Sequence, residues 1–222
     1  MYKGLYDNFS HWFHDGRGTI WFYSDPHFAD EDVKYFRGED HISDEEQIKR
    51  INSKIGKYDT LIILGDIGDT EWVKKIRGYN VLIMGNHDSG ASIYKRVKQE
   101  ITINDGNSPI NEGKKVTFYD NHLFDEVYEG ALIISEKLIL SHEPVDYPFA
   151  FNIHGHTHAL PQRPDETHWN MCAEAIDYTP VPLNQIIKSG VLKSIETIHR
   201  ETIDRATERK RKREKDEKED NQ

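Results

Sequence analysis

The sequence predicts an α/β fold in which a mostly parallel sheet faces a second sheet. In the first half of the 222 residues, apolar runs alternate with helical patterns in the order strand, helix, strand, helix, strand, helix. This order is typical of right-handed crossovers between parallel strands. After about residue 120 the apolar runs are short and follow one another, which favours hairpins and a second sheet.

The first strand is expected at residues 19–24, where β-branched and aromatic side chains follow one another. A helix is expected next, because Ser43 and Glu46 have the spacing of a capping box. Isoleucines then recur at helical spacing over residues 48–55, and Gly56 marks the end of the helix.

The next two strands are expected at residues 60–64 and 80–84. Both are apolar without alternation, as expected of parallel strands that are covered on both faces. A short helix over residues 72–76 separates them, and a further helix is expected over residues 93–97.

The second half is predicted to begin with a loop over residues 101–121, which is rich in Gly, Asn and Asp. Short strands and one helix should then follow. The strands are expected at 126–129, 131–135, 137–141, 149–153 and 169–176, and the helix at 183–187.

Composition excludes several classes of function for this protein. The net charge of −10 argues against a protein that binds nucleic acid by bulk electrostatics. The single cysteine, Cys172, excludes an intrachain disulfide and a Cys-rich zinc site. Residues 1–18 lack the apolar core of a signal peptide, and no apolar run is long enough to span a membrane. A cytoplasmic protein without membrane contact is therefore expected.

Three segments are expected along the chain. Residues 1–18 form an aromatic extension that packs on the domain, and residues 19–199 form the domain itself. Residues 200–222 are nearly all charged and are expected to be a solvated helix or disordered. This tail includes the basic run 209–213.

Five strand ends carry side chains that core packing does not explain. They are Asp25 and His27; Asp66; Asn86, His87 and Asp88; His142; and His156 and His158. All of the candidate ligands among them are nitrogen or oxygen donors, a set that suits Mn, with Fe, Zn or Ni as alternatives, and that can hold two ions. Asp66 stands alone on its strand, so it is the natural carboxylate to bridge them.

The order of these motifs resembles that of the calcineurin-like metallophosphoesterases. The matching residues are Asp25-Pro26-His27, Gly65-Asp66, Gly85-Asn86-His87-Asp88, His142 and Gly155-His156-Thr157-His158. The resemblance covers about residues 19–190 and implies a four-layer αββα sandwich of two mixed sheets flanked by helices. The compact body looks most like the small bacterial and phage phosphoesterases.

The resemblance also implies a role for each residue. Asp25, His27 and His158 would hold the first metal, and Asn86, His142 and His156 the second. Asp66 would bridge the two ions. His87 would give a proton to the leaving group, and Asp88 would orient His87 through a hydrogen bond.

These roles imply hydrolysis of a phosphate ester by a metal-bridging hydroxide. The protein-phosphatase branch typically has an Arg shortly after its second motif, and residues 65–70 contain none. A small-molecule or nucleotide substrate is therefore expected, with diesters favoured over monoesters. The alternatives are a nuclease that uses the basic run 209–213 and a non-catalytic binding scaffold. The sequence leaves the oligomeric state open.

Overall fold

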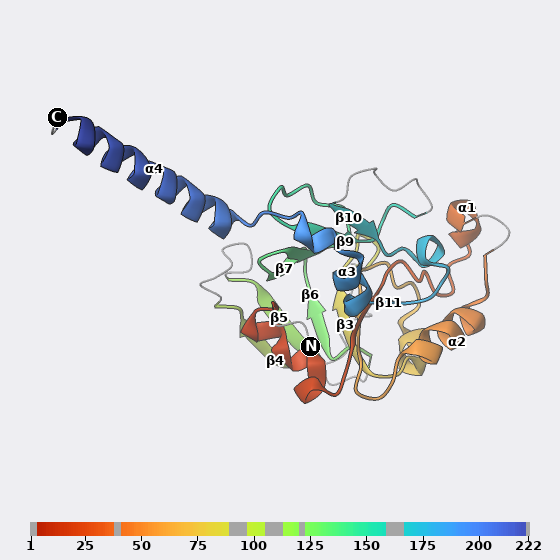
Figure 1. Cartoon of the computed structure of the whole chain (residues 1–222). Helices are drawn as coiled ribbons and strands as arrows, with labels where there is room; N and C mark the ends of the chain where they lie inside the picture. The colour runs from red at the N-terminus through yellow and green to blue at the C-terminus, as the bar shows by residue number, and fades with distance from the viewer. Residues whose placement is uncertain are drawn as a thin grey trace.

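The computed structural model describes residues 4–37, 41–88, 97–104, 113–119, 123–158 and 167–220. Its strands form one seven-stranded and one four-stranded sheet, with helices beside them (Figure 1). Both sheets contain parallel and antiparallel neighbours. The α/β sandwich of two mixed sheets flanked by helices is therefore confirmed.

The larger sheet has the strand order β11-β1-β2-β3-β6-β5-β4. Strands β1, β2, β3 and β6 are parallel, so their carboxyl ends lie side by side at the same end of the sheet. The bounds are β1 Ile20–Tyr23, β2 Thr60–Ile63, β3 Tyr79–Ile83, β4 Val97–Thr102, β5 Lys115–Tyr119, β6 Glu126–Tyr128 and β11 Val181–Pro182.

The smaller sheet has the order β10-β9-β8-β7, with β7 and β8 forming the expected hairpin. Strands β8, β9 and β10 are parallel to one another. The bounds are β7 Leu132–Ser135, β8 Leu138–Leu140, β9 Phe151–His154 and β10 His168–Asn170.

The helices are short apart from the last one. The α-helices are α1 Val33–Arg37, α2 Asp44–Lys54, α3 Leu183–Ser189 and α4 Ile198–Asp220. The 3-10 helices are η1 Asp7–Gly16, η2 Thr70–Lys75, η3 Ala173–Ile176 and η4 Val191–Lys193. Helix α2 begins with the expected cap, since the Ser43 hydroxyl accepts the backbone N–H of Glu46. Its buried isoleucines pack against apolar residues of β2 and β3.

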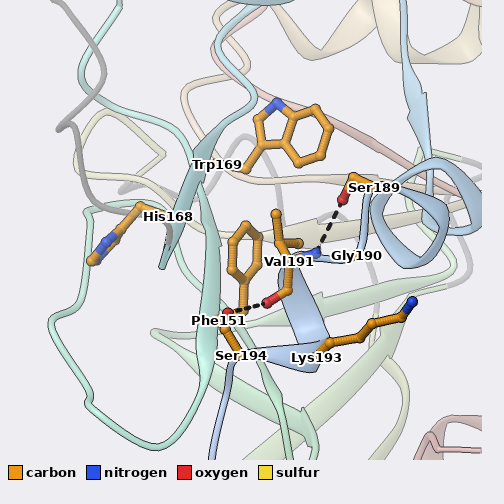
Figure 2. A pocket seen from close by; sticks show the side chains of 8 residues that line it. All are labelled: Phe151, His168, Trp169, Ser189, Gly190, Val191, Lys193 and Ser194. Atoms are coloured by element: carbon orange, nitrogen blue, oxygen red, sulfur yellow. Dashed lines mark hydrogen bonds between the residues drawn. The ribbon is translucent and has the colours of Figure 1, made fainter.

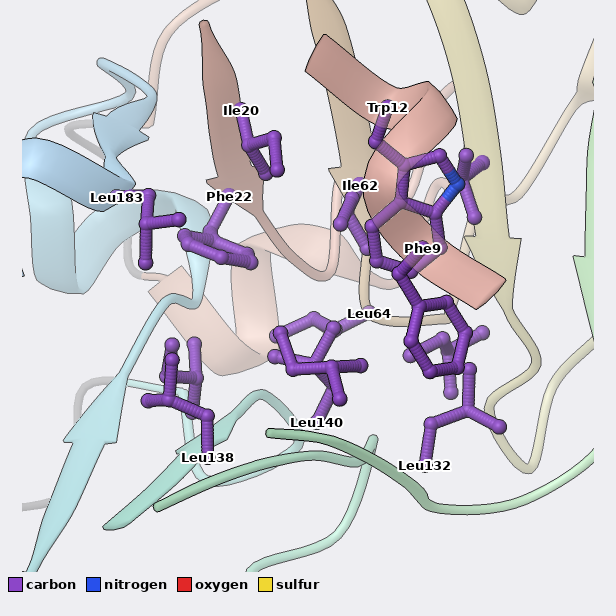
Figure 3. Packing of buried hydrophobic residues seen from close by; sticks show 14 of the residues in the cluster. Phe9, Trp12, Ile20, Phe22, Ile62, Leu64, Leu132, Leu138, Leu140 and Leu183 are labelled. Atoms are coloured by element: carbon purple, nitrogen blue, oxygen red, sulfur yellow. The ribbon is translucent and has the colours of Figure 1, made fainter. Parts of the chain in front are cut away.

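The main core lies between the two sheets (Figure 3). Phe22, Ile62 and Leu64 come from the larger sheet or its strand ends, and Leu132 and Leu140 come from the smaller one. All five side chains are buried. Each Å² of apolar surface buried in this layer stabilises the sandwich by about 25 cal/mol.

The N-terminal helix η1 takes part in this core. Phe9 and Trp12 are buried among the residues between the sheets (Figure 3). The Trp12 indole N–H donates to Oε1 of Glu126 at 3.1 Å, and the hydroxyls of Tyr79 and Tyr128 donate to the same carboxylate. A buried carboxylate with several donors thus fixes η1 on the sheet.

Several expected elements differ from those observed. Strand β6 lies in the larger sheet, beside β3, and not in the second sheet. Residues 97–102 and 115–119 pair as strands β4 and β5, where a helix end and a loop were expected. The rest of the expected helix at 93–97 lies outside the described residues. Residues 173–176 form a 3-10 helix in place of a strand. Pairing with residues distant in the sequence decides the places of β4, β5 and β6.

Helix α4 extends away from the rest of the molecule (Figure 1). Ion pairs one helical turn apart, such as Arg200 with Asp204, lie along it. The charged tail is thus a helix over most of its length. In the part of the chain that the structure describes, no helix has the length and apolar character needed to cross a bilayer.

Candidate metal centre

The candidate ligands of the larger sheet follow three neighbouring parallel strands. Asp25 and His27 follow β1, Asp66 follows β2, and Asn86 follows β3. Parallel pairing of β1, β2 and β3 places these strand ends side by side. His142 follows β8, and His156 and His158 follow β9 of the smaller sheet. Residues from both sheets therefore meet at one end of the sandwich.

The first group consists of Asp25, His27 and His158, whose ligand atoms lie within 4.8 Å of one another. Nε2 of His27 and Nε2 of His158 each lie 3.9 Å from Oδ1 of Asp25. The side chains of Asp25 and His27 are 0% and 3% exposed. One carboxylate oxygen and two imidazole nitrogens thus converge on a shared point, which is the arrangement that a divalent ion requires.

The second group consists of Asp66, His142 and His156, again within 4.8 Å of one another. Nε2 of His142 lies 2.8 Å from Oδ1 of Asn86, 3.1 Å from Nδ1 of His156 and 3.4 Å from Oδ2 of Asp66. Asn86 therefore joins this group. The two groups contain every residue that the sequence assigns to a metal, and their roles as ligands remain predictions.

The Asp66 carboxylate lies between the two groups. Its Oδ2 is 3.7 Å from Nε2 of His27 in the first group and 3.4 Å from Nε2 of His142 in the second. Its Oδ1 accepts the backbone N–H of His87 at 3.0 Å. A single carboxylate is thus oriented so that one oxygen faces both candidate ion positions, as a bridging ligand must be.

The hydrogen bonds of the Asp25 carboxylate indicate whether a cation fits this position. Its Oδ2 accepts hydrogen bonds from the backbone N–H of His156 at 2.9 Å and from the thiol of Cys172 at 3.2 Å. Its Oδ1 is buried and has no hydrogen-bond partner among the described residues. A buried carboxylate oxygen without a partner is costly. A cation held between Asp25, His27 and His158 would satisfy it, so the residues present fit a metal ion.

Hydrogen bonds on the far side of three of the four imidazoles orient the rings. Nδ1 of His27 lies 3.0 Å from Oδ2 of Asp30, and Nδ1 of His158 lies 2.7 Å from Oε1 of Glu174. Nδ1 of His142 lies 2.7 Å from the carbonyl oxygen of Leu64. With a proton on each Nδ1, the lone pair on Nε2 faces the candidate ion position.

The first group's two histidines have pKa values shifted in opposite directions. Burial lowers the pKa of His27, and the carboxylates of Asp25 and Asp66 oppose this only in part. Burial also acts to lower the pKa of His158, but the hydrogen bond with Glu174 and the charge of Asp25 outweigh it, so that pKa is raised. Metal binding requires neutral imidazole, so the raised pKa of His158 means that protons would compete with a metal ion for this side chain.

The backbone is strained at the candidate ligands. Five of them have positive φ angles: Asp25 (53°), His27 (45°), Asp66 (55°), His156 (67°) and His158 (47°). Residues other than glycine seldom adopt this left-handed region, and those that do concentrate at functional sites. The strain indicates that these strand ends are shaped to aim side chains.

Two glycines of the motifs allow the carboxylates to approach the backbone. A Cβ on Gly85 would lie 2.2 Å from Oδ1 of Asp66, and a Cβ on Gly155 would lie 2.3 Å from Oδ2 of Asp25. Any side chain at these positions would therefore displace a candidate ligand.

His87 and Asp88 do not form the expected pair. The Asp88 carboxylate is buried and accepts the backbone N–H groups of Gly85 at 2.7 Å, Asp66 at 2.8 Å and Ile67 at 3.0 Å. Among the described residues, its hydrogen bonds go to these three amides and none goes to the His87 imidazole. The hydrogen bond expected between Asp88 and His87 is therefore not found among the described residues, and the orienting role of Asp88 stays a prediction. His87 is exposed, with its ring centroid 5.7 Å from that of His27.

Sequence reasoning did not identify the residues behind the ligands: Asp30, Arg37, Cys172 and Glu174. Asp30 follows His27 by three residues, and this spacing could have suggested it. Glu174 is 16 residues from His158 and Arg37 is 137 residues from Glu174. No local pattern connects those positions.

A separate cavity of about 490 Å³ lies between β10 and the segment from α3 to η4 (Figure 2). Its wall includes a hydrogen bond from the Ser194 hydroxyl to the carbonyl of Val191 at 3.0 Å. The cavity is lined by Phe151, His168, Trp169, Ser189, Gly190, Val191, Lys193 and Ser194. It contains none of the candidate ligands.

The fold and this site together define a two-sheet α/β sandwich with two His/Asp groups that could hold metal ions. No family model matches the chain, and no curated protein is detectably similar to it. Among solved structures, the protein of unknown function AQ665 from Aquifex aeolicus is 22% identical, with a TM-score of 0.55; the match covers 77% of this chain and 98% of that one. At that identity the likeness shows the fold alone.

The nuclease MPE of Pseudomonas putida is a second structural neighbour. It is 21% identical, and the match covers 63% of this chain and 61% of that one, with a TM-score of 0.36. This likeness is too weak to support an inference about function.

Proposed function

We propose that this chain is a metal-dependent phosphoesterase with a dinuclear centre. The observation that carries the proposal is the position of Asp66, whose Oδ2 faces Nε2 of His27 and Nε2 of His142 at 3.7 and 3.4 Å. A carboxylate shared in this way between two sets of ligands is suited to hold two ions a few Å apart. The motif order seen in the sequence, which resembles that of the calcineurin-like enzymes, supports the same reading.

The donor set supports Mn²⁺ as the first choice of metal. Asp25, His27, Asp66, Asn86, His142, His156 and His158 supply only nitrogen and oxygen donors. Imidazole and carboxylate ligands suit Mn, and they also suit Fe, Zn and Ni. The thiol of Cys172 donates to Asp25, and burial raises its pKa, so it stays protonated and contributes no thiolate ligand.

When bound, two divalent cations would supply an activated water as nucleophile and neutralise charge on the phosphate oxygens. Asp66 would keep the two ion positions together, and Asp88 would hold the backbone of Asp66 and Ile67 in place. The exposed imidazole of His87 would lie at the rim and, when protonated, would donate its N–H proton to the departing oxygen. General-acid catalysis of this kind typically contributes roughly 10²–10⁴-fold.

The substrate is proposed to be a small phosphodiester or a nucleotide. The segment after β2, Gly65-Asp66-Ile67-Gly68-Asp69-Thr70, has no Arg to bind a phosphoprotein phosphate. Hydrolysis of bis-p-nitrophenyl phosphate and of p-nitrophenyl phosphate should be compared with Mn²⁺, Ni²⁺ and a chelator. We expect metal-dependent turnover, faster on the diester and abolished by the chelator.

The variant that tests the bridging role is Asp66→Asn, which keeps the shape of the side chain but removes the charge between the two groups. It should lose activity together with one or both ions, measured by elemental analysis of the purified protein. Turnover of neither compound with any metal would contradict the proposed function. It would favour a binding scaffold on the same fold.

A second candidate function, nucleic-acid cleavage, rests on helix α4. Residues 209–213 are five consecutive cations on an exposed helix. Only Lys210 pairs with an acidic residue of the described chain, Glu214 at 3.9 Å. The body is strongly acidic, so this helix is the most favourable place for a phosphate backbone to bind.

The two candidates can be separated with charge variants. A triple neutral variant in the basic run should bind and cleave single-stranded DNA more weakly while hydrolysing the small diester normally. For single strands the salt dependence should fall by about 0.7 in logarithmic slope for each lost phosphate contact. This triple variant combines Arg211→Gln, Lys212→Gln and Arg213→Gln. Its control removes three exposed cations of the body instead, by Lys54→Gln, Arg77→Gln and Lys188→Gln. Equal behaviour of both triple variants on DNA would exclude the nucleic-acid role of α4.

A further inference from the structure

The two candidate ion positions differ in what lies behind their histidines. In the first group, carboxylates face the far nitrogens of both rings: Asp30 at 3.0 Å from His27 and Glu174 at 2.7 Å from His158. In the second group, the far nitrogen of His142 faces a neutral carbonyl, that of Leu64. A carboxylate behind an imidazole makes the ring a stronger base and a stronger metal ligand than a carbonyl does.

Arg37 connects the two sides of the first group. Its Nε donates to Oε2 of Glu174 at 3.1 Å, and its side chain is 2% exposed. Its other nitrogens donate to the backbone carbonyl of Pro26 at 3.3 Å and to that of Asp25. One buried guanidinium therefore holds the backbone of one ligand, Asp25, and the carboxylate that orients another, His158. Such a planar group with several donors loses little freedom on forming these bonds.

The first group also carries more negative charge and is more deeply buried than the second. The first group has its own carboxylate, Asp25, and two further carboxylates behind it, of which one is paired with Arg37. The second group shares Asp66 with the first, and its other oxygen ligand, Asn86, is neutral and exposed. A divalent cation in the first position would therefore meet more negative charge with less competing water.

We propose that the two metal positions are unequal, that the first group binds its cation first and more tightly, and that Arg37 and Glu174 are the positioning residues responsible. The ion at the second group then exchanges more readily, with Asn86 and His156 as its outward ligands. This inference rests on the proposed dinuclear centre, but it concerns metal binding and not turnover.

The test is a titration of the metal-free, full-length protein with Mn²⁺ alone, followed by calorimetry and by the electron paramagnetic resonance of free Mn²⁺. The wild type should show two classes of site with clearly different affinities. Glu174→Gln keeps an acceptor for His158 but removes the charge, and Glu174→Ala removes both. The tight class should weaken in that order, by roughly 10- to 100-fold overall, while the weak class stays unchanged.

Asn86→Ala provides the reciprocal variant, because it should weaken only the weak class. Arg37→Gln should act on the tight class, as the Glu174 variants do. Glu136→Gln, which alters an exposed turn outside both groups, is the matched control and should titrate as the wild type does. Thermal unfolding of each metal-free variant reports whether it folds.

A spectroscopic readout separates positioning from general stability. In the metal-free protein, the ¹⁵N shifts of the His158 imidazole should show Nδ1 protonated in the wild type and a tautomer mixture in Glu174→Ala. Two equal classes of site in the wild type would overturn the proposal. The proposal would also be overturned if the titration of Glu174→Gln coincided with that of the wild type. The same holds if Glu174→Gln weakened binding to the weak class and not to the tight class. Failure of phosphodiester hydrolysis would overturn the proposed function alone, since these titrations contain no substrate.

Discussion

The carboxylate of Asp88 accepts the backbone N–H of Asp66 at 2.8 Å and thereby connects the ends of β3 and β2. The same carboxylate accepts the N–H groups of Ile67, which follows Asp66, and of Gly85 at the end of β3, so one side chain fixes both strand ends. Asp88 thus fixes the backbone beside the candidate ligand Asp66.

Asp88→Ala is expected to damage the fold and the metal centre together. Each buried N–H group left without an acceptor costs about 1–3 kcal/mol, and Asp66 loses a contact that fixes its left-handed backbone. Urea unfolding should show a lower free energy of unfolding, and Mn²⁺ titration should show weaker binding in both classes. Unchanged metal binding with lost turnover would instead return Asp88 to the role of orienting His87.

His87→Ala is expected to separate catalysis from metal binding. Its imidazole is exposed, and only its backbone N–H contacts Asp66, so both ions should bind as in the wild type. The turnover number should fall by roughly 10²–10⁴-fold on substrates with a poor leaving group, and less on nitrophenyl esters. His199→Ala, an exposed histidine of α4, serves as the control. Full activity of His87→Ala on the poor leaving group would refute the proton-donor role.

Gly155→Ala is expected to displace Asp25. The new Cβ would lie 1.9 Å from Oγ of Ser24 and 2.3 Å from Oδ2 of Asp25, well inside van der Waals contact, so both side chains must move. Stability should fall by about 1–3 kcal/mol, as for overpacking in a core, and the tight class of Mn²⁺ binding should weaken. Gly130→Ala, where a Cβ meets no atom within 4 Å, is the control for a glycine replaced without a clash; its φ of +77° adds a backbone cost that Gly155 lacks. Equal metal binding in both variants would show that Asp25 is not a ligand.

Glu126 is expected to make stability depend on pH. Burial raises the pKa of Glu126, but the hydrogen bonds from His11, Tyr128 and Tyr79 outweigh it, so the folded pKa lies below the ordinary value of 4.5. A lowered folded pKa contributes stability that is complete above the unfolded value and is lost as the pH falls through the folded one.

Urea unfolding at a series of pH values from about pH 7 to about pH 3 would measure this dependence. Glu126→Gln should be less stable than the wild type near neutrality, because its amide nitrogen cannot accept the hydrogen bonds that fix η1. Its stability should also fall less steeply below about pH 4.5. Parallel pH profiles for the two proteins would assign the acid sensitivity to other carboxylates.

The alternation of strands and helices in the first half could be predicted from the sequence because a pattern of neighbouring residues indicates each element. Strands β1, β2 and β3 are continuous apolar runs, and the cap of α2 lies within four residues. Strands β4 and β5 are half polar and are defined by pairing with each other and with β6. No short pattern carries that information, so they were read as helix and loop.

The sequence by itself determined which residues are candidate ligands, because each of them follows a strand and stands in a short motif. Only the tertiary structure decided which residues support them. Glu174, Arg37 and Leu64 reach their histidines or their backbone targets across long separations, and Asp88 turns away from its neighbour in sequence. The physical reason is that a strand end fixes where a side chain begins. Its hydrogen-bond partner depends on which segments the fold packs beside it.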